Sequence, residues 1–595
     1  MATEVEGPGA LTQNSELRPK LGCANHSHGE APCKNLGRLA CEGCFLVTYC
    51  SKSCQESHWS THKRDCKSPL KKRKWVPSWV SQGRMPSFVS DGIKRPPMTI
   101  FGTHKYLWGN VPAIDVIQLR KNEGEKFSGP LHVLFAASGD IRNAVVSITG
   151  LPRSYRGPLC IVINDVDIDV VARNMILLLV FFVERDPIMA AEYVIHLWYS
   201  MFITEPCHEL LQSKLKPMVI NVCNKISEKP GSKLLRKTWV FEGNRLRLTL
   251  TRDNWFSLLS YFDTPPGITM EVAQQVRRRV VSAPERIDYV DRVLSIQAPS
   301  TRLCIVKFRE DGILLPFSQS RHDFTVVNPT FFHLNGEWPM MDNADPRSGW
   351  SLDSYLKFDI GRAKNDQYGK LYYYLKQLFA DFHRRLRSLP IEINIFHMDA
   401  RNLEGYLDGM RFDRIDVNNI SDAHFLGVDV TLRTFRPLLQ PVTANRHATL
   451  ITLFLNAVAD MVITRERMAV ADHDVSYLAE MDYLEERVLR YMPRLNGPNP
   501  ANFFIKLIAQ TRLYDMDAYF DRYMKRIGFT RTALAAGLQM KRTHTIIDPW
   551  PMRFSGGSAT PEVQDEFALL VSSDFTGQER YVEWRIADDG GENTR

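Results

Sequence analysis

Short apolar runs alternate with segments of helical period from about residue 100 onward. The runs Leu131–Ala137 and Leu159–Ile163 are each followed by a helix-like stretch, and Ile391–Phe396 and Arg414–Val417 repeat the pattern later in the chain. Strands of parallel sheets are buried on both faces, so they form continuous apolar runs separated by crossover helices. The pattern therefore predicts an α/β body with a parallel sheet.

Two parts of this body depart from the alternation. Residues 205–345 carry a Lys/Arg-rich helical pattern and several turns bounded by Pro or Gly, which predicts an insertion. Residues 443–524 are mostly helical in pattern. The short runs Glu566–Val571 and Glu579–Ile586 are separated by a turn, so we expect them to form an antiparallel pair at the edge of the sheet.

A chain of 595 residues is too long for one hydrophobic core, and composition divides it into six segments. We expect a disordered lead-in (1–20), a small cysteine-rich module (21–68), a basic Pro-rich linker (69–98), the first half of an α/β domain (99–204), an inserted subdomain (205–345), and the second half of the α/β domain with a helical C-terminal region (346–595).

The overall composition is that of an ordinary globular protein, with 44% hydrophobic and 24% charged residues. The longest apolar runs, such as Met175–Val183, are much shorter than the roughly 20 residues that cross a bilayer. The first 20 residues lack the pattern of a secretory signal. We therefore expect a soluble intracellular protein without a membrane partner, and the sequence leaves nucleus or cytoplasm undecided.

Seven of the eleven cysteines lie between Cys23 and Cys66, and this cluster is the strongest chemical signal in the chain. With His62 it offers eight donors, the number that two tetrahedral zinc ions require. The donors are Cys23, Cys33, Cys41, Cys44, Cys50, Cys54, His62 and Cys66. Paired donors separated by two or three residues let a short loop bring both to about 2.0–2.3 Å of one ion.

Disulfides are the alternative interpretation of this cluster, and three features argue against it. The number seven is odd, the chain shows no secretory signal, and the other four cysteines are scattered in apolar contexts. A segment this small and this poor in aliphatic residues buries little apolar surface, so metal binding would supply most of its folding free energy. Seven thiolates and two Zn²⁺ also lower the formal charge from +8 to about +5, a modest excess that demands no nucleic-acid partner.

The spacing Cys41-x2-Cys44-x5-Cys50-x3-Cys54-Gln55-x3-Trp59-x2-His62-x3-Cys66 resembles the MYND zinc finger, including Tyr49 before the third pair. The resemblance implies a cross-braced pair of sites. The first zinc would be held by Cys23, Cys33, Cys50 and Cys54, and the second by Cys41, Cys44, His62 and Cys66. It also implies a module that binds a proline-containing peptide of a protein partner and does not recognise nucleic acid by sequence.

One donor and three neighbouring side chains leave alternatives open. The family usually begins with a Cys-x2-Cys pair, whereas Cys23 lies ten positions before Cys33, so His26 and His28 are alternative donors. His58 is interpreted as a solvated helix position because the eight donors are already assigned. Gln55 and Trp59 are interpreted either as contacts of the peptide or as a small local core beneath the metal loops.

The run Lys71-Lys72-Arg73-Lys74 follows the module. Its two interpretations are a nuclear localisation patch and a solvated linker whose charges keep two domains apart.

Polar residues follow the predicted strands, where ligands bind in parallel sheets. They are Ser138, Gly139, Asp165, Asp167 and Asp399. The order resembles the Rossmann-like methyltransferase fold, which implies Asp165 or Asp167 on the ribose and Asp399 on the adenine of S-adenosylmethionine. The single glycine after the first strand departs from that family. The alternative interpretation is that these acids cap the following helices, because strand-to-helix turns favour the same residue types.

The segments FAASGDIRN, INDVD, VVARN and HLWYS resemble a domain of unknown function found beside MYND fingers, largely in fungal proteins. That resemblance implies a fold without an assigned reaction, and no catalytic residue is assigned here. Two functions are compatible with the sequence. The first is a zinc-binding interaction adaptor with an α/β body and no turnover; the second is a divergent methyltransferase whose finger recruits the substrate.

Overall fold

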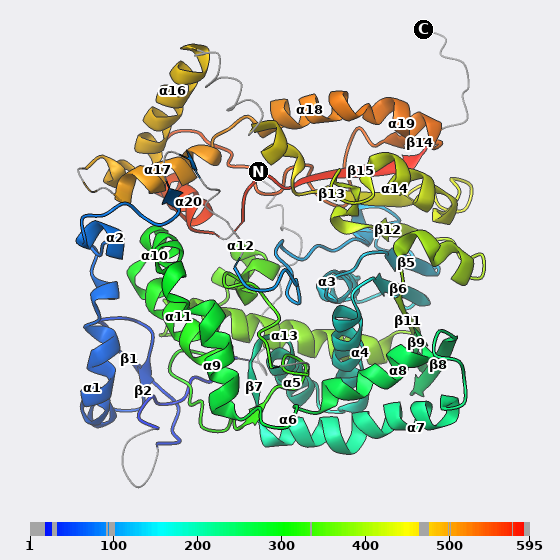
Figure 1. Ribbon diagram of the computed structural model, residues 1–595, viewed down its shortest axis with the longest axis horizontal. Helices are drawn as coiled ribbons and strands as arrows, with labels where there is room; N and C mark the ends of the chain where they lie inside the picture. Colours follow the sequence, from blue (N-terminus) through cyan, green and yellow to red (C-terminus); the bar gives the residue numbers. More distant parts are fainter. Residues whose placement is uncertain are drawn as a thin grey trace. The chain divides into compact units, whose positions relative to one another are not determined.

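The computed structural model describes residues 18–26, 33–90, 93–94, 101–333, 336–462, 475–497, 499, 501–573 and 575–587. The expected lead-in up to residue 17, His28 and residues 588–595 lie outside these ranges. The chain divides into two compact units (Figure 1). Unit 1 comprises Met1–Ala113, Ala172–Leu235 and Thr251–Arg384, and unit 2 comprises Ile114–Val171, Arg236–Leu250 and Arg385–Arg595.

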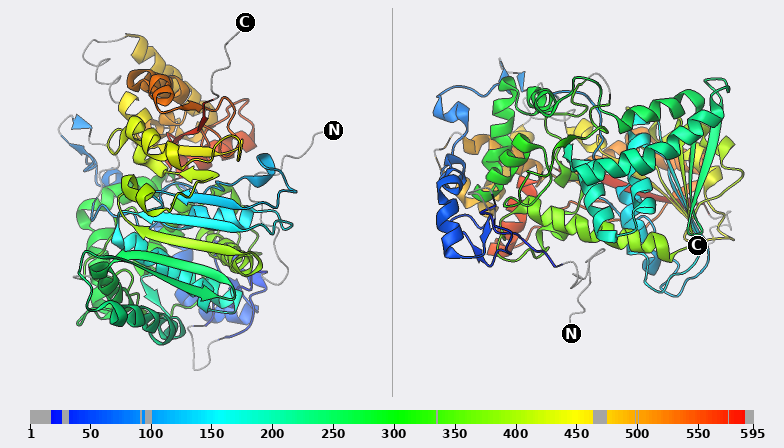
Figure 2. Two further views of the ribbon diagram at one scale, coloured as in Figure 1. Left: turned by 90° about the vertical axis from the view of Figure 1, so that its right-hand side faces the viewer. Right: turned by 90° about the horizontal axis from the view of Figure 1, so that it is seen from below.

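Unit 2 is built on a mixed sheet of nine strands in the order β14-β15-β13-β12-β5-β6-β11-β9-β8, seen as twisted arrows in the left view of Figure 2. The strands are β5 (Leu131–Phe135), β6 (Leu159–Asp165), β8 (Leu234–Phe241), β9 (Asn244–Thr251), β11 (Ile391–His397), β12 (Arg414–Asp416), β13 (Thr449–Phe454), β14 (Leu538–Met540) and β15 (Arg580–Ile586).

The four strands predicted from apolar runs form the middle of this sheet. Strand β5 lies between β12 and β6 and is parallel to both, and β11 runs parallel to β6. Their side chains are buried on both faces, as in the burial of Ile161, Val162 and Ile163 at 1% exposure or less. The prediction of an α/β body with parallel central strands is confirmed.

A hairpin from the predicted insertion joins the sheet as well. Strands β8 and β9 are connected by Glu242 and Gly243, which have φ values of 50° and 91°. Two consecutive residues with positive φ form the tight turn that matches the twist of a β-hairpin. Strand β9 then pairs in parallel with β11. Residues 205–345 thus contribute two strands to unit 2, which the sequence pattern did not predict.

The C-terminal strands confirm one expectation and contradict another. The run Glu579–Ile586 is a strand as predicted, β15, and pairs antiparallel with both β13 and β14, but it is not at the edge of the sheet, because β14 lies outside it. The run Glu566–Val571, however, lies within helix α20 (Pro561–Ser572). Thr560 caps this helix by accepting a hydrogen bond from the Val563 amide, and Pro561 occupies its first turn. An N-cap followed by proline is a helix start, so the predicted strand is wrong.

The helices of unit 2 include α3 (Arg142–Gly150), α14 (Gly427–Phe435), α16 (Val475–Tyr491), α17 (Ala501–Thr511), α18 (Met516–Ile527), α19 (Phe529–Ala535) and α20. Unit 1 is mainly helical, with α1 (Lys52–Cys66), α2 (Ser78–Ser81), α5 (Pro187–Tyr199), α6 (Glu205–Leu210), α7 (Lys216–Ile226), α8 (Arg252–Ser257), α9 (Met270–Val281), α10 (Ile287–Ile296), α11 (Pro299–Asp311) and α12 (Leu352–Leu356). The division between the units falls within α4 (Ile168–Val183) and α13 (Gln367–Ser388).

The core of unit 1 is rich in aromatic rings. Trp198 on α5 stacks on Phe379 of α13 with ring centroids 5.5 Å apart, and Trp350 packs edge-on against both. Aromatic side chains bury large areas and prefer these offset and edge-to-face arrangements. The finger segment belongs to the same unit, where β1 (Leu39–Ala40) and β2 (Thr48–Tyr49) form a small antiparallel ribbon before α1.

Candidate metal centre

The first group of donors gathers around the start of α1. The sulfur atoms of Cys23, Cys33, Cys50 and Cys54 all lie within 4.8 Å of one another. The Cys50 sulfur is 3.5 Å from that of Cys33 and 3.4 Å from that of Cys54. Ser51 caps α1 by accepting a hydrogen bond from the Cys54 amide at 3.2 Å, so the helix start fixes one ligand.

The second group combines a tight loop with the end of α1. Cys41, Cys44, His62 and Cys66 form it, again with all donor atoms within 4.8 Å. The Cys44 amide donates to the Cys41 carbonyl at 3.1 Å, which closes the loop between the first two ligands. His62 and Cys66 are four residues apart on α1 and therefore face the same side of the helix.

The spacing of the donor atoms matches tetrahedral zinc in the second group, and the first-group sulfurs, 3.4 and 3.5 Å apart, are slightly closer together than ideal. Sulfur ligands about 2.3 Å from a tetrahedral zinc ion are about 3.8 Å apart, and a sulfur and an imidazole nitrogen are about 3.5 Å apart. The sulfurs of Cys41 and Cys66 are 3.8 Å apart, and the Cys44 sulfur is 3.5 Å from His62 Nε2. Thiolate and imidazole are also the donors that zinc prefers.

Hydrogen bonding and burial shift the pKa values of these thiols in opposite directions. The S–H of Cys44 stabilises the neighbouring thiolate and lowers the pKa of Cys41 to about 3, and the S–H of Cys54 lowers the pKa of Cys50 to about 7. Burial raises the pKa of Cys23 to about 12. Sulfurs this close repel one another when all are ionised, so the fully ionised groups require a bound divalent ion.

The alternatives for the first site differ in their surroundings. Cys23 is 1% exposed and its sulfur lies in the first group. His26 Nε2 lies 2.8 Å from the Ser318 carbonyl, a hydrogen-bonding partner outside the finger. These contacts favour Cys23 over His26 as the donor.

Two aromatic partners give His58 a role that the sequence did not predict. His58 is only 9% exposed, its Nδ1 lies 3.0 Å from the Tyr49 hydroxyl, and its ring stacks on that of His62. The prediction of a solvated position is therefore wrong, because His58 on α1 packs against Tyr49 of β2. Trp59 on the same helix is 37% exposed, and Gln55 is half-buried one turn before it.

The finger is fastened to the helical part of unit 1 through its second metal loop. The Cys44 carbonyl accepts hydrogen bonds from Asn365 Nδ2 at 2.9 Å and from the Ser300 hydroxyl at 3.0 Å. The Asn365 amide donates to the Phe45 carbonyl at 3.1 Å, and the Lys364 ammonium lies 4.5 Å from the centre of the Phe45 ring. The metal loop is thus held by residues from α11 and from the segment before α13.

The basic segment after the finger is packed against α10 and α11. Arg302 on α11 donates to the carbonyls of Leu70 and Lys72, each at 3.1 Å, and its guanidinium lies 5.1 Å from the centre of the Trp75 ring. Asp291 on α10 accepts hydrogen bonds from the Ser78 amide and hydroxyl. The chain from Leu70 to Ser78 is therefore anchored at both ends.

The acids at the strand ends of unit 2 have local partners. Asp165 accepts hydrogen bonds from the amides of Gly139 and Asp167, each at 2.9 Å, and burial raises its pKa. Asp167 accepts from the Asp169 amide at 2.8 Å in the first turn of α4. Asp399 pairs with the Arg401 guanidinium, which lowers the pKa of its carboxyl.

Ser138 and Asn164 complete this strand-end cluster. The Ser138 hydroxyl donates to the Gly139 carbonyl at 2.8 Å. Asn164 Nδ2 donates to the carbonyls of Ala136 at 2.8 Å and Met398 at 3.0 Å, and so links the ends of β5, β6 and β11. These contacts favour capping and strand-end roles, and cofactor binding stays a prediction.

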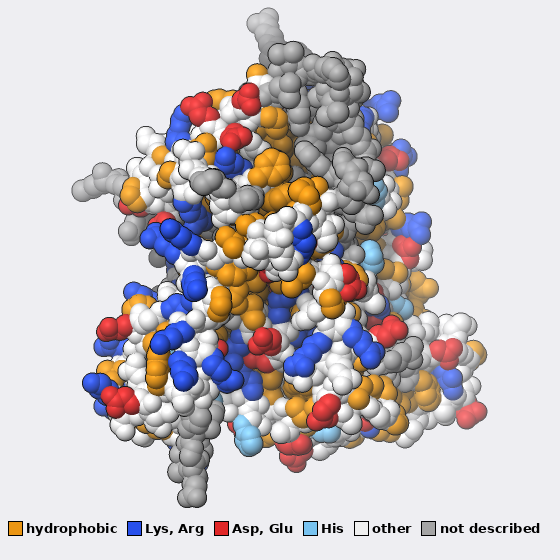
Figure 3. Space-filling model, turned by 60° about the vertical axis from the view of Figure 1, so that its left-hand side comes forward, with side chains coloured by type: hydrophobic (Ala, Val, Ile, Leu, Met, Phe, Trp, Pro, Cys, Tyr) orange, Lys and Arg blue, Asp and Glu red, His pale blue; other side chains and the backbone are white. Residues whose placement is uncertain are grey.

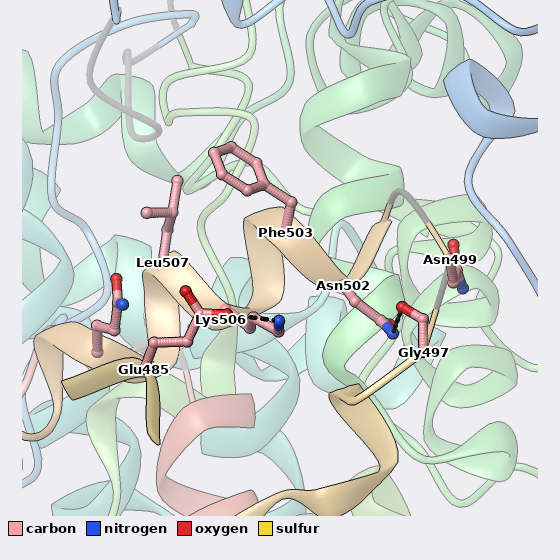
Figure 4. A pocket seen from close by; sticks show the side chains of 8 residues that line it. Glu485, Gly497, Asn499, Asn502, Phe503, Lys506 and Leu507 are labelled. Atoms are coloured by element: carbon pink, nitrogen blue, oxygen red, sulfur yellow. Dashed lines mark hydrogen bonds and ion pairs between the residues drawn. The ribbon is translucent and has the colours of Figure 1, made fainter. Parts of the chain in front are cut away.

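A cavity of about 210 Å³ lies between α16 and α17 (Figure 4). Lys506 and Glu485 form an ion pair of 2.8 Å at its wall, and Phe503 beside them is 57% exposed. None of the residues predicted from the sequence lines this cavity.

Comparison with known proteins agrees with the geometry of the finger. Residues 23–66 match the family model of the MYND finger, and residues 107–203 match that of a domain of unknown function (DUF4470). No solved structure matches the chain. Among the described helices, none is both long enough and apolar enough to span a membrane. The chain therefore carries a MYND-type zinc finger with two Cys/His ligand groups, followed by a domain of unknown function.

Proposed function

We propose that this protein is a two-zinc interaction adaptor whose finger binds a proline-containing peptide of a protein partner. Two Zn²⁺ ions, one in each ligand group, hold the short strands and α1 in place. The proposed peptide contacts are Gln55 and Trp59, which follow one another by one turn on α1 and so share a face.

The exposure of Trp59 carries this proposal. Its indole is 37% exposed, and its ring packs edge-on against that of His62 in the second ligand group, with centroids 6.0 Å apart. Exposed tryptophans are frequent anchors of protein interfaces, because they bury a large apolar area together with a hydrogen-bond donor. Leu36 and Leu39 on the same finger are also exposed, at 51% and 42%, and enlarge its apolar surface.

The test compares Trp59→Ala with wild-type protein on an array of proline-containing peptides. We expect both zinc ions to remain bound and peptide affinity to fall by about 30-fold, the equivalent of about 2 kcal/mol for a central anchor. Ser57→Ala is the matched control, since Ser57 is exposed on the same helix. Equal binding by Trp59→Ala and wild type would assign the tryptophan to the local core.

For unit 2 we propose a Rossmann-like scaffold. With the parallel strand β9 of the added hairpin set aside, the strands β11-β6-β5-β12-β13, numbered along the chain, have the order 3-2-1-4-5. This is the order of the first five strands in doubly wound nucleotide-binding sheets. This order also supports the second candidate function, a divergent S-adenosylmethionine-dependent methyltransferase. A fold alone does not assign a reaction, and the local partners of Asp165 and Asp399 favour the adaptor.

Calorimetric titration with S-adenosylmethionine separates the two candidates. Micromolar binding that is lost in Asp165→Ala or Asp167→Ala would favour the methyltransferase. We expect no binding heat, because both oxygens of the Asp165 carboxylate already accept hydrogen bonds from backbone amides.

A further inference from the structure

A rigid, unneutralised basic surface begins beside Trp59. Between positions 63 and 74 the chain carries seven basic residues and one acid, Asp65. We call these seven the basic rim: Lys63, Arg64, Lys67, Lys71, Lys72, Arg73 and Lys74. Six of them are exposed and Lys71 is half-buried. Blue side chains gather at the lower left of the face shown in Figure 3.

The basic rim has no carboxylate partner in the part of the chain that the structure describes. Its single acid, Asp65, interacts electrostatically with Lys307 and Glu310 on α11. An ion pair on α1 joins Lys52 to Glu56, before the basic rim begins. Seven like charges in twelve positions repel one another, so an anionic partner would stabilise this surface.

The basic rim is also held in a fixed conformation. Helix α1 carries Lys63 and Arg64 in its last turn, and Lys67 is its C-cap residue. Arg302 fixes the backbone around Lys71 through the carbonyls of Leu70 and Lys72. A preorganised surface loses less conformational entropy on binding than a flexible basic tail does. This arrangement differs from that of a solvated linker.

The basic rim is continuous with the proposed peptide contact. Lys63 and Lys67 follow Trp59 by four and eight positions, and the Lys67 ammonium lies 5.8 Å from the centre of the Trp59 ring. Eight helical residues span about 12 Å, a distance that an extended peptide covers in about four residues. A peptide anchored at Trp59 therefore reaches the basic rim within about four residues.

From this charge complementarity we infer that the partner peptide carries a run of Asp or Glu within about four residues of its Trp59 anchor, and that this run binds along the basic rim. The inference rests on the proposed peptide function and adds the chemistry of the partner. Continuity with Trp59 favours an acidic peptide over a nucleic-acid backbone, which needs no tryptophan-anchored segment.

A paired peptide array on the full-length zinc-loaded protein tests this inference. Each proline-containing core is synthesised twice, once flanked by Glu and once by Gln. We expect the Glu-flanked member to bind about tenfold more tightly, which is about 1.4 kcal/mol. This advantage should shrink between about 0.1 M and about 1 M NaCl, where the Debye length falls from about 10 Å to about 3 Å.

The variant Lys63→Gln/Lys67→Gln/Lys72→Gln should abolish the preference for Glu and retain both zinc ions. The matched control is Lys214→Gln/Lys225→Gln/Lys229→Gln, which removes three exposed charges from another part of unit 1 and should retain the preference. Zinc content and circular dichroism establish that both variants are folded.

Three results would overturn the inference, and they are distinguishable. Equal binding of both peptide members, with both lost in Trp59→Ala, would overturn it and leave the proposed function standing. Absence of binding to every peptide would overturn both this inference and the proposed peptide-binding function. In the third result, a labelled DNA duplex binds the wild-type protein more tightly than any Glu-flanked peptide does and fails to bind the triple variant. That result would assign the basic rim to nucleic acid.

Discussion

Asn365 donates a side-chain hydrogen bond at 2.9 Å to the backbone carbonyl of Cys44, a zinc-ligand residue 321 positions away in the sequence. The Ser300 hydroxyl donates to the same carbonyl. Because this carbonyl belongs to the loop between two ligands, the second metal site and the helical part of unit 1 share a contact. The finger is therefore an integral part of that unit.

Replacement of Asn365 tests this contact. We expect Asn365→Ala to lower the free energy of unfolding by about 1 kcal/mol, a typical value for one hydrogen bond, with Ser300 still satisfying the carbonyl. Thermal unfolding measures the change, and zinc content should stay at two ions per chain. Asn224→Ala, at an exposed position on α7, is the control. An unchanged melting temperature in Asn365→Ala would show that the contact contributes nothing.

Ligand replacement should separate the two metal sites. We expect Cys54→Ser to release the zinc of the first site, and Cys66→Ser to release that of the second, because a tetrahedral thiolate site loses affinity with each ligand. Metal analysis measures the zinc content. Hydrogen exchange around Asn365 should increase more in Cys66→Ser than in Cys54→Ser, since only the second site includes the Cys44 loop.

Cys160→Ser is the control for both ligand variants. Cys160 lies on β6, outside both groups, so its replacement by serine should leave two zinc ions bound. If Cys66→Ser retained two ions, the assignment of the second site would be wrong.

The buried His196 should make unit 1 sensitive to acid. Burial, with the nearby charges of Lys376 and Arg321, lowers the pKa of His196 from 6.5 to about 3. Below pH 6.5 the unfolded chain binds a proton at His196 that the folded chain does not bind. The contribution of the neutral, buried His196 to the free energy of unfolding is therefore complete above pH 6.5 and is lost as the pH falls. The loss approaches about 1.4 kcal/mol per pH unit below the unfolded pKa.

Chemical unfolding at a series of pH values measures this dependence. The variant His196→Gln retains a polar partner for Ser200, which lies 3.1 Å from His196 Nδ1, and removes the titration. We expect the difference in unfolding free energy between wild type and variant to change between pH 6.5 and about 3. If the free energy of unfolding changed with pH in the same way for wild type and His196→Gln, the prediction would be wrong.

The buried pair of Lys541 and Glu583 should contribute strongly to unit 2. Glu583 is fully buried, lies 3.0 Å from the Lys541 ammonium, and accepts hydrogen bonds from the amides of Thr545, Ile546 and Ile547. We expect Glu583→Ala to cost about 3 kcal/mol of unfolding free energy, because it leaves a buried ammonium unpaired.

The control is Glu485→Ala, whose partner Lys506 forms a half-exposed pair. Such pairs contribute about 1 kcal/mol or less. Denaturant unfolding compares the two variants, and equal losses would show that burial does not strengthen the first pair.

The sequence predicts the finger well because its information is local. Ligands such as Cys41 and Cys44 are separated by two residues, and His62 and Cys66 by one helical turn, so spacing alone places them around one ion. The interpretation of His58 was wrong for the complementary reason. Counting donors identifies the ligands, but it does not reveal that the Tyr49 hydroxyl offers His58 a buried partner.

The central strands were predictable because continuous apolar runs indicate burial on both faces. The β8–β9 hairpin was missed because its strands mix Arg and Lys with apolar residues, although Glu242-Gly243 is a turn signal. The short apolar run Glu566–Val571 has the length of a strand, but Thr560 followed by Pro561 is a helix start, and the run belongs to α20. Contacts such as that between Asn365 and Cys44 depend on the fold, and no local pattern contains them.

The anchoring of the chain after α1 has a mechanical consequence. Tension applied to α1 would pass through Cys66 to the segment that Arg302 holds, and from there into α10 and α11. Hydrogen bonds to α10 and α11 would carry this load, because the segment after α1 is bonded to both helices. A force applied to α1 would therefore be transmitted to α10 and α11.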